Sequence, residues 1–341
     1  MNRIIVTRFS AMGDVAMVAS VLKALQNQQE DLEIILVSRS FFQPFFEKIP
    51  RVRFHAIEPK GRHQGVFGLV RLYKELQKYQ PDAVADLHNN LRSRFLDFLF
   101  KTAGIKTQIL DKGRAEKKAL TRKENKILKP LKATTERYAD VFRSLGYAVT
   151  LDHQLQQEFR LIPQGMQQIL ANKKLKIGIS AFAQHPYKIF PLHKMEQVIE
   201  FLATQEVEVL LFGGGEKEKQ MTEKWAKPYA NVSTLVGKYS LKEELDIIAH
   251  LDLMISMDSA GMHMASLVGT RCISLWGATH PYAGFLGYGQ HLEDCIQVDH
   301  PNRPNSVYGN IPCPCDEVEA IDLISAEMVI NRLKEFIAEH D

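Results

Sequence analysis

The sequence predicts an α/β protein made of two halves, each with a doubly wound sheet of parallel strands. Three observations lead to this fold class. Short apolar runs, typical of strands buried on both faces, alternate with segments of helical spacing. The alternation stops in the polar, irregular residues 150–172 and then starts again. Several apolar runs end in a glycine or a polar loop that opens a helix, which is typical of parallel strands joined by crossovers.

Length and composition bound the class of protein. The chain has 341 residues, so two domains of about 150–170 residues each are expected. It has 45 % apolar and 24 % charged residues and no apolar run of eighteen or more, which excludes a transmembrane span. The N-terminus is typical of a first strand rather than a signal peptide, and four cysteines suit a reducing compartment, so a cytoplasmic location is expected. A net charge of +3 excludes a polycation of the nucleic-acid-binding kind.

Residues 251–280 form the most informative stretch. The apolar run Leu251–Ser256 predicts a buried strand, and the next polar residues, Asp258 and Ser259, are good N-cap residues for a helix. A helix of small residues follows from about Gly261, and Cys272–Trp276 predicts another strand. The stretch is therefore one strand–helix–strand unit of a parallel sheet.

The loop of this unit is a candidate diphosphate site. Unpaired N–H groups and the helix dipole both favour a phosphate at such a helix start. His263 lies four to five residues past the cap and adds a hydrogen-bond donor. The alternative is a capped helix whose histidine only packs, and the stretch alone leaves both readings open.

The first half follows the same plan. Arg3–Phe9 is a β-branched run, a turn follows at Ser10–Asp14, and Val15–Gln26 has helical spacing. The turn holds a single glycine, so the dinucleotide-binding fingerprint G-x-G-x-x-G is absent. Further strands are predicted at 32–37 and 81–87, and helices at 41–49, 66–77, 93–103 and 138–145.

A polar cluster follows the strand at 81–87, where the carboxyl end of a strand meets a ligand in open α/β sheets. It includes His88, Asn89, Asn90 and Arg92. The functional interpretation is a ligand site. The alternative is that Asn89 and Asn90 only form turns and helix caps.

Residues 112–132 are strongly basic. Nine lysines and arginines stand against two glutamates, which is not a balanced, salt-bridged surface. Two explanations of this charge are possible: a solvated helix face, or an anionic partner. The partner would be a phosphorylated substrate or an anionic membrane surface. Nucleic acid is not expected as a partner, because no aromatic residue is interleaved with the charges.

The second half restarts with a strand at Leu175–Ser180. We expect residues 1–160 and 173–320 to form the two domains, with the helix in 321–341 packing back on the first. Cys313 and Cys315 lack the paired spacing of a zinc site and are interpreted as structural. Other predicted strands lie at 207–212 and 232–237, and other helices at 192–204, 216–226, from Ser240 and at 325–339.

Four motifs, taken in order and spacing, are similar to those of a known family. They are Ser10–Asp14 for S-x-x-G-D, Lys188–Pro191 for K-x-[WF]-P, Leu235–Leu241 for L-x-G-x-x-S-L, and Asp258–His263 for D-[ST]-G-x-x-H. Across nearly its full length the chain resembles glycosyltransferase family 9, the lipopolysaccharide core heptosyltransferases. One residue departs from the pattern: Ala260 stands where the family usually has glycine, with Gly261 one place later.

The resemblance implies the GT-B fold, in which two Rossmann-like, doubly wound domains face each other across a cleft. It implies an inverting glycosyltransferase that moves a heptose from ADP-heptose to the inner core of lipopolysaccharide, with no cofactor and no required metal. The implied partners are a nucleotide-sugar donor, bound by the second domain, and an anionic, lipid-linked saccharide acceptor, bound by the first. Contact with the inner membrane leaflet would then be peripheral.

Inverting transfer needs a base facing the acceptor hydroxyl and a cation on the leaving diphosphate. The resemblance gives these roles to Asp14 and Lys188. The alternatives are that Asp14 caps the helix that begins at Val15, and that Lys188 is an ordinary solvated lysine.

The resemblance also implies two sets of binding residues. In the donor set, Tyr239 would line the nucleotide base and Glu216 would accept hydrogen bonds from the ribose. The donor set is Ser180, Ala181, Lys188, Glu216, Tyr239, Asp258, Ser259, Gly261 and His263. The acceptor set is Ser10, Met12, Gly13, His88, Asn89, Asn90 and Arg92, with Lys117, Lys118 and Arg122 of the basic run facing lipid phosphates.

Three other functions compete with this interpretation. An oxidoreductase lacks the glycine fingerprint, and a nucleotide-sugar epimerase of the same two-domain plan leaves the basic run unexplained. A catalytically silent protein that binds lipopolysaccharide or a partner protein leaves the pair Asp14 and Lys188 unexplained. The residues favour a glycosyltransferase, while the identity of the sugar and of the nucleotide rests on the resemblance alone.

Overall fold

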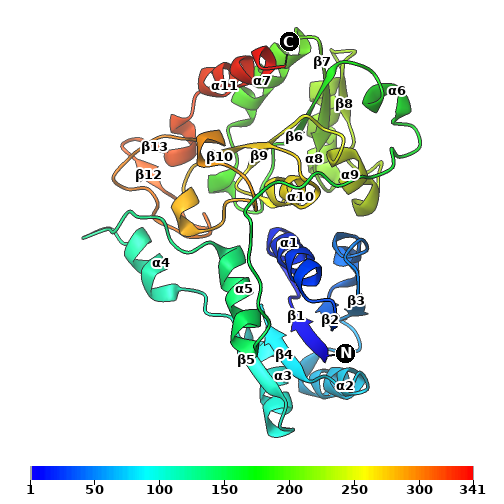
Figure 1. The fold of residues 1–341 in the computed structure, drawn as a ribbon. Helices are drawn as coiled ribbons and strands as arrows, with labels where there is room; N and C mark the ends of the chain where they lie inside the picture. Colours follow the sequence, from blue (N-terminus) through cyan, green and yellow to red (C-terminus); the bar gives the residue numbers. More distant parts are fainter. Residues whose placement is uncertain (1, 341) are drawn as a thin grey trace. The chain divides into compact units, whose positions relative to one another are not determined.

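The computed structural model describes residues 2–340. The chain divides into two compact units (Figure 1). The N-terminal unit holds the described residues up to Arg114 together with Lys132–His153. The C-terminal unit holds Ala115–Leu131 and the chain from Gln154 onward.

The N-terminal unit is a five-stranded parallel sheet with helices on both faces. Its strand order is β3-β2-β1-β4-β5, so the chain moves outward from β1 and then crosses to the other side of β1 at β4. Helices α2 and α3 cover one face, and α1 and α5 the other (Figure 1). The elements are β1 (Asn2–Thr7), α1 (Met12–Gln28), β2 (Leu32–Ser38), η1 (Ser40–Phe45), β3 (Val52–Ala56), α2 (Gly65–Gln77), β4 (Ala83–Asp86), α3 (Leu91–Thr102), β5 (Lys106–Ile109) and α5 (Thr134–Leu145).

The C-terminal unit repeats this plan with six parallel strands in the order β11-β10-β9-β6-β7-β8. Here the chain crosses to the other side of β6 at β9. Its strands are β6 (Leu175–Ser180), β7 (Val207–Phe212), β8 (Val232–Thr234), β9 (Leu253–Met257), β10 (Cys272–Trp276) and β11 (Cys295–Gln297), with a hairpin of β12 (Pro314–Cys315) and β13 (Val318–Glu319). Its helices are α6 (Gln167–Leu170), η2 (Pro186–Lys188), α7 (Leu192–Ala203), α8 (Glu216–Ala226), α9 (Leu241–Ile248), α10 (Ala260–Val268), η3 (Pro281–Ala283), η4 (Leu292–Asp294), η5 (Ala320–Leu323) and α11 (Ala326–Ala338). Helix α4 (Arg114–Thr121) begins at the last residue of the first N-terminal segment and continues into the C-terminal unit.

Each sheet is buried by apolar side chains from its strands and covering helices. In the N-terminal unit Ile5, Val37 and Val84, from three neighbouring strands, share one cluster with Leu72 of α2 and Leu96 of α3. The C-terminal cluster joins the strands β6, β7, β9 and β10 to α7, α8 and α11. The near-continuous apolar strands predicted from the sequence are therefore the central strands of two doubly wound sheets, and the predicted fold class is confirmed.

The structure also holds strands that the sequence did not predict. β3 and β5 are the edges of the N-terminal sheet, and β11 is an edge of the other. The sequences VRFHA and KTQI of β3 and β5 contain polar residues and stay partly exposed, so they lack the apolar run of a central strand. The helix predicted at 93–103 begins at Leu91, because Asn90 caps it. The aromatic segment at 41–49 is a 3-10 helix that ends at Phe45.

The boundary between the units differs from the residue ranges expected above. Contacts divide the chain after His153 and place Ala115–Leu131 in the C-terminal unit. The C-terminal helix α11 contributes Val329, Leu333 and Phe336 to the core of the C-terminal unit. Among residues 2–340, no helix is long and apolar enough to cross a membrane.

Candidate functional site

The crossover between β1 and β4 places Asp14 at the carboxyl edge of the N-terminal sheet. Asp14 lies in the first turn of α1, and its Oδ2 is 2.5 Å from Nη2 of Arg8 and accepts the Ala11 N–H at 3.3 Å. The hydroxyl of Tyr138, on α5, donates to Oδ1 at 3.4 Å. The helix begins at Met12 with Ala11 as its N-cap, so Asp14 does not cap a helix that begins at Val15. As the third residue of α1, Asp14 accepts the N–H of that N-cap residue, and its carboxylate is also held by two side chains.

Arg8 joins the two strands at this crossover. It is buried, its Nη1 donates to the carbonyl of Leu87 at 2.8 Å, and its guanidinium lies 5.8 Å from the centre of the Tyr138 ring. Burial opposes its charge, but Tyr138 and Asp14 outweigh burial and raise the pKa of Arg8. Arg8 therefore supplies a fixed positive charge beside Asp14.

The loop after β4 is organised by one buried carboxylate, Asp86. It accepts four hydrogen bonds within 3.0 Å, and three of them come from the loop and the first turn of α3. A second buried acid, Asp97, lies below it on α3, where burial and then Asp86 raise its pKa to about 9. Asp97 is therefore protonated near neutral pH. The four donors to Asp86 are Thr7 Oγ1, the His88 and Asn89 amides and Ser93 Oγ.

Two of the predicted acceptor residues have structural partners in this loop. Asn89 has a φ of 49° and donates to the Leu110 carbonyl at 2.7 Å, and Asn90 accepts from the Ser93 N–H at 2.9 Å as the cap of α3. Turns and caps are therefore the roles that the contacts show for both asparagines. Arg92, one residue into α3, is exposed.

His88 is a neutral group in the same loop. Its Nδ1 accepts the Phe9 N–H at 3.1 Å, which ties the loop after β1 to the loop after β4. Burial, and then the positive charge of Arg8, lower its pKa to about 4. It can therefore exchange hydrogen bonds with a sugar, but it does not supply positive charge near neutral pH.

The crossover between β6 and β9 brings Lys188 and Asp258 together in the C-terminal unit. Lys188 ends η2, Asp258 directly follows β9, and their Nζ and Oδ2 atoms are 2.8 Å apart. The Lys188 stem lies against Gly309, where a Cβ would come within 2.5 Å of the Lys188 Cγ. Lys188 is therefore held in place, which the alternative of a solvated lysine does not expect.

The N-terminus of α10 lies beside this ion pair. Ser259 is its N-cap, and in the described chain no side chain caps its first turn. Gly261 packs so closely on β6 that a Cβ there would lie 2.5 Å from Ser180 Oγ. His263 is buried one turn further along. The first amides of α10 are thus close to Ser180 and remain uncapped by side chains, which suits a phosphate.

The departure at Ala260 fits this geometry. Ala260 is the first residue of α10 and is not among the residues with positive φ. An alanine Cβ is therefore accommodated at this position, while the close approach that requires glycine falls on Gly261.

The other predicted donor residues line the same edge of the C-terminal sheet. Ala181 is buried directly after β6. Glu216 is exposed and begins α8 after β7, and Tyr239 follows β8 and precedes Ser240, which caps α9. Since β9, β6, β7 and β8 are consecutive neighbours, the strands that precede Asp258 and Tyr239 are three strand spacings apart, about 14 Å.

The side chains of the basic run, residues 112–132, differ in their exposure. Lys117 is buried with its ammonium 4.3 Å from the centre of the Phe285 ring, while Lys118 and Arg122 are exposed. Lys126 donates to the Pro301 carbonyl at 2.8 Å. Lys117 thus contacts an aromatic ring of the C-terminal unit. Of the three basic residues predicted to bind the acceptor, Lys118 and Arg122 are the two that are exposed to solvent.

The cysteines lie in an apolar environment. Cys313 and Cys315 are free, fully buried and clustered with Ala278 and Ala320. Burial, and then Cys315, raise the pKa of Cys313 to about 11, so it is a protonated thiol near neutral pH. Within residues 2–340 no three His, Cys, Asp or Glu side chains gather as metal ligands.

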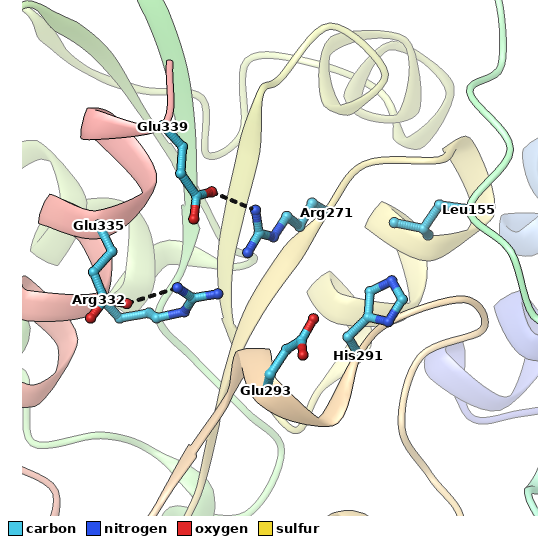
Figure 2. Close-up of a pocket in the computed structure, with 7 residues that line it drawn as sticks. All are labelled: Leu155, Arg271, His291, Glu293, Arg332, Glu335 and Glu339. Atoms are coloured by element: carbon cyan, nitrogen blue, oxygen red, sulfur yellow. Dashed lines mark hydrogen bonds and ion pairs between the residues drawn. The ribbon is translucent and has the colours of Figure 1, made fainter. Parts of the chain in front are cut away.

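A hollow of about 650 Å³ lies elsewhere in the C-terminal unit and holds none of the predicted site residues (Figure 2). Arg271 precedes β10, so the hollow is at the amino end of that strand, away from Asp258. Its arginines are paired: Arg271 with Glu339 at 3.2 Å and Arg332 with Glu335 at 2.8 Å, and both also with the buried Asp294. These ion pairs tie α11 to the sheet.

Arg8, Tyr138 and Asp86 contact the candidate residues but were not predicted from the sequence. Arg8 had one signal, since it is a cation at the end of an apolar strand just before the Ser10–Asp14 turn. Tyr138 had none, because it is 124 residues from Asp14 and sits in an ordinary helical pattern. Asp86 ends a strand and could be found by its position before a polar loop.

Two parallel doubly wound sheets, each with its candidate residues at the point where strand order reverses, are the fold of a GT-B glycosyltransferase. Solved structures agree. The glycosyltransferase of family 9 from Veillonella parvula superposes with a TM-score of 0.74, at 20 % identity, over 99 % of this chain and 98 % of that one. Escherichia coli heptosyltransferase WaaC, solved with ADP, gives a TM-score of 0.67 at 19 % identity over 98 % and 99 % of the two chains.

The family follows from the sequence. The model of glycosyltransferase family 9 (heptosyltransferase) matches residues 69–311, more than two thirds of the chain. Lipooligosaccharide heptosyltransferase 2 of Haemophilus influenzae is 29 % identical over 299 residues, which are 80 % of this chain and 82 % of that protein. The chain belongs to glycosyltransferase family 9, and it is a glycosyltransferase.

Proposed function

We propose that this enzyme transfers a heptose from ADP-heptose to the inner core of lipopolysaccharide with inversion at the anomeric carbon. The names of its relatives support the sugar and the pathway, since they are lipopolysaccharide and lipooligosaccharide heptosyltransferases. WaaC, which shares the fold, has been solved with ADP and with a fluorinated ADP-heptose. The observation that carries the proposal is that Asp14 and Lys188, with Asp258, lie at the crossover points of the two sheets, where open α/β sheets bind ligands.

The transfer is written with Asp14 as the base. Its carboxylate takes the proton of the acceptor hydroxyl while the oxygen forms a bond to the anomeric carbon. The bond from that carbon to the diphosphate oxygen breaks on the opposite face, and ADP leaves with the electron pair. Arg8 and Tyr138 hold the Asp14 carboxylate in place during this step.

The leaving diphosphate is stabilised by the C-terminal unit. Lys188 supplies the positive charge, and the uncapped first turn of α10 with Ser259 and His263 supplies hydrogen bonds. Asp258 orients Lys188, and Ser180 with Gly261 sets the height of α10 over β6. The ribose and the base extend along the sheet edge to Glu216 and Tyr239.

The acceptor belongs to the N-terminal unit in this proposal. Ser10 lies in the loop after β1, and Met12 and Gly13 are the first two residues of α1, directly before Asp14. In the loop after β4 and at the start of α3, His88, Asn90 and Arg92 offer neutral donors and one cation. The exposed Lys118 and Arg122, which belong to the C-terminal unit, meet phosphates of the lipid-linked acceptor. Such an acceptor places the enzyme in the cytoplasm, in peripheral contact with the inner leaflet.

A calorimetric titration with ADP, UDP and GDP, each with and without magnesium, tests the donor half of the proposal. We expect ADP to bind most tightly, with or without the metal, and Lys188→Ala to weaken ADP by about tenfold or more, because a charge-assisted contact is lost. Lys227→Ala, an exposed lysine just after α8, is the matched control. Preference for UDP or GDP would keep the glycosyltransferase but contradict the donor. Neither the epimerase nor the silent binder has an observation in its favour once the family is assigned.

A further inference from the structure

Four large apolar side chains stand exposed at the carboxyl edge of the N-terminal sheet. They are Phe41, Val66, Phe67 and Leu91, with exposed fractions of 57 %, 59 %, 92 % and 92 %. We call this group the apolar rim. Each lies in the first turn of the helix that follows β2, β3 or β4, so parallel strands bring all four to one edge, the edge that also holds Asp14.

The exposure of Phe67 is built into the fold. The buried His63 accepts the Glu58 N–H at 3.0 Å and lies 3.2 Å from a carboxylate oxygen of Glu75, on α2. At Gly68 a Cβ would meet the His63 backbone at 2.3 Å, so the first turn of α2 rests directly on this histidine. The chain is thus fixed on both sides of Phe67, and the ring is held outward.

In η1, too, one aromatic side chain is exposed while its neighbours are buried. Phe42 and Phe45 are buried there, while Phe41, next to them, points out. On α3, Leu91 is exposed immediately after the cap Asn90. The rim therefore consists of single side chains turned out of well-packed segments.

Positive charge surrounds the rim. The three segments that carry it, residues 39–46, 57–67 and 87–92, contain four lysines or arginines and one carboxylate. That carboxylate, Glu58, is paired with Arg62 at 3.1 Å, while Arg39, Lys60 and Arg92 are exposed. Apolar side chains separated by cations fit the interface of an anionic bilayer, where the rings enter the acyl boundary and the cations meet headgroups.

We propose that the apolar rim docks the enzyme on an anionic lipid bilayer. The bilayer is favoured over a protein partner because the apolar groups are distributed over the first turns of three helices with a positive excess, rather than joined in one groove. The inference rests on the proposed function, whose acceptor is anchored in such a bilayer. It assigns the docking to a surface of the N-terminal unit that is separate from the basic run.

Vesicle sedimentation of the full chain tests the proposal. Vesicles of phosphatidylcholine with phosphatidylglycerol are expected to bind the enzyme more tightly than vesicles of phosphatidylcholine alone. The double variant Phe41→Ser, Phe67→Ser is expected to lose about tenfold in affinity, because two exposed rings no longer leave water. Phe98→Ser is the matched control, since Phe98 is 60 % exposed in the same unit but lies in the middle of α3.

A second measurement follows the ring itself. In Phe67→Trp the new indole is exposed, whereas Trp225 and Trp276 are buried and give a constant background. A blue shift of the emission on adding anionic vesicles is expected. An unchanged emission, or a double variant that binds vesicles like the wild type, would overturn the proposal. It would also be overturned if the wild type formed an oligomer without lipid and the double variant were a monomer.

The titration with ADP separates this inference from the proposed function. The double variant is expected to bind ADP and to use a soluble, delipidated core acceptor as the wild type does. If the wild type itself neither binds ADP nor transfers heptose, the proposed function fails whatever the vesicles show.

Discussion

Asp14 and Lys188 show how far a motif determines a site. Both were predicted from short patterns, and both are held by partners: Arg8 and Tyr138 for the first, Asp258 for the second. Arg8 and Tyr138 escaped the sequence analysis because their contacts come from folding and not from spacing along the chain. Tyr138 reaches Asp14 only because α5 packs beside α1.

The guanidinium of Arg8 is expected to act through the position of Asp14. Arg8→Gln removes the contact at 2.5 Å and the bond to Leu87, so the carboxylate loses its fixed orientation. A fall in kcat of about 10- to 100-fold is expected, with the Kd for ADP unchanged, because misplacing a reacting group by about 1 Å costs this much. Steady-state kinetics with Arg71→Gln, an exposed arginine on α2, as control would check it. An equal loss of ADP binding would refute a role confined to Asp14.

Asp97 gives the N-terminal unit a pH-dependent stability. Its pKa is raised from 3.8 to about 9 in the folded chain, so the folded chain keeps a proton that the unfolded chain releases in between. The stability contributed by this group is complete below about pH 4 and is lost as pH rises toward 9, at up to about 1.4 kcal/mol per pH unit.

The substitution Asp97→Asn is expected to flatten that slope. An amide keeps the shape of the protonated acid but cannot ionise, so the variant should gain stability over the wild type as pH rises from 5 to 8. Urea unfolding at several pH values measures the difference, with the exposed Asp111→Asn as control. Parallel curves for Asp97→Asn and the wild type would show that Asp97 carries no buried proton.

At the scale of elements, the central strands and their helices follow from apolar periodicity, and the edges do not. β3 and β5 were missed because half-exposed edge strands lack a continuous apolar run. The start of α3 was misplaced by two residues because the cap, Asn90, was read as part of a ligand loop. Caps and ligand residues use the same side chains, so sequence alone does not separate them.

The approach of α10 to β6 is an element-scale feature with a direct test. A Cβ at Gly261 would lie 2.5 Å from Ser180 Oγ and 2.8 Å from Ser256 Oγ, so Gly261→Ala must push the helix start away from the sheet. Such overpacking costs roughly 1–3 kcal/mol of stability. We expect ADP affinity to fall by about tenfold, because the displaced first turn no longer holds its N–H groups in position for the diphosphate. Adding Ser180→Gly in the same chain is expected to restore part of the binding in calorimetry. No loss in the single variant would mean that the first turn of α10 is not part of the donor site.

At the scale of the whole molecule, the division into two units was predicted. The crossing of the chain into the C-terminal unit at Ala115–Leu131 and back to the N-terminal unit at Lys132–His153 was not. The basic run was expected within the first domain, residues 1–160, yet Ala115–Leu131 belongs to the C-terminal unit. Lys117 on Phe285 is one of the contacts that place it there, and such a long-range contact has no local signal. The final helix likewise follows the C-terminal unit through Phe336.

Helix α11 is therefore expected to contribute to the stability of the C-terminal unit. Phe336 is buried against its core and under the Arg271 guanidinium, so Phe336→Ala should cost about 3–5 kcal/mol of unfolding free energy. Leu292→Ala, which is exposed in the same unit, should cost far less. Thermal or urea unfolding compares the two, and similar small losses would show that α11 is not part of this core.

The most direct test of the account is the transfer reaction itself, followed by mass spectrometry of the acceptor. Wild-type enzyme with ADP-heptose and an inner-core lipopolysaccharide acceptor is expected to add one heptose and release ADP. Asp14→Asn is expected to lose about 10²- to 10⁴-fold in turnover while binding ADP normally, because only the base is removed. The absence of transfer by the wild type, or undiminished turnover in Asp14→Asn, would contradict the account.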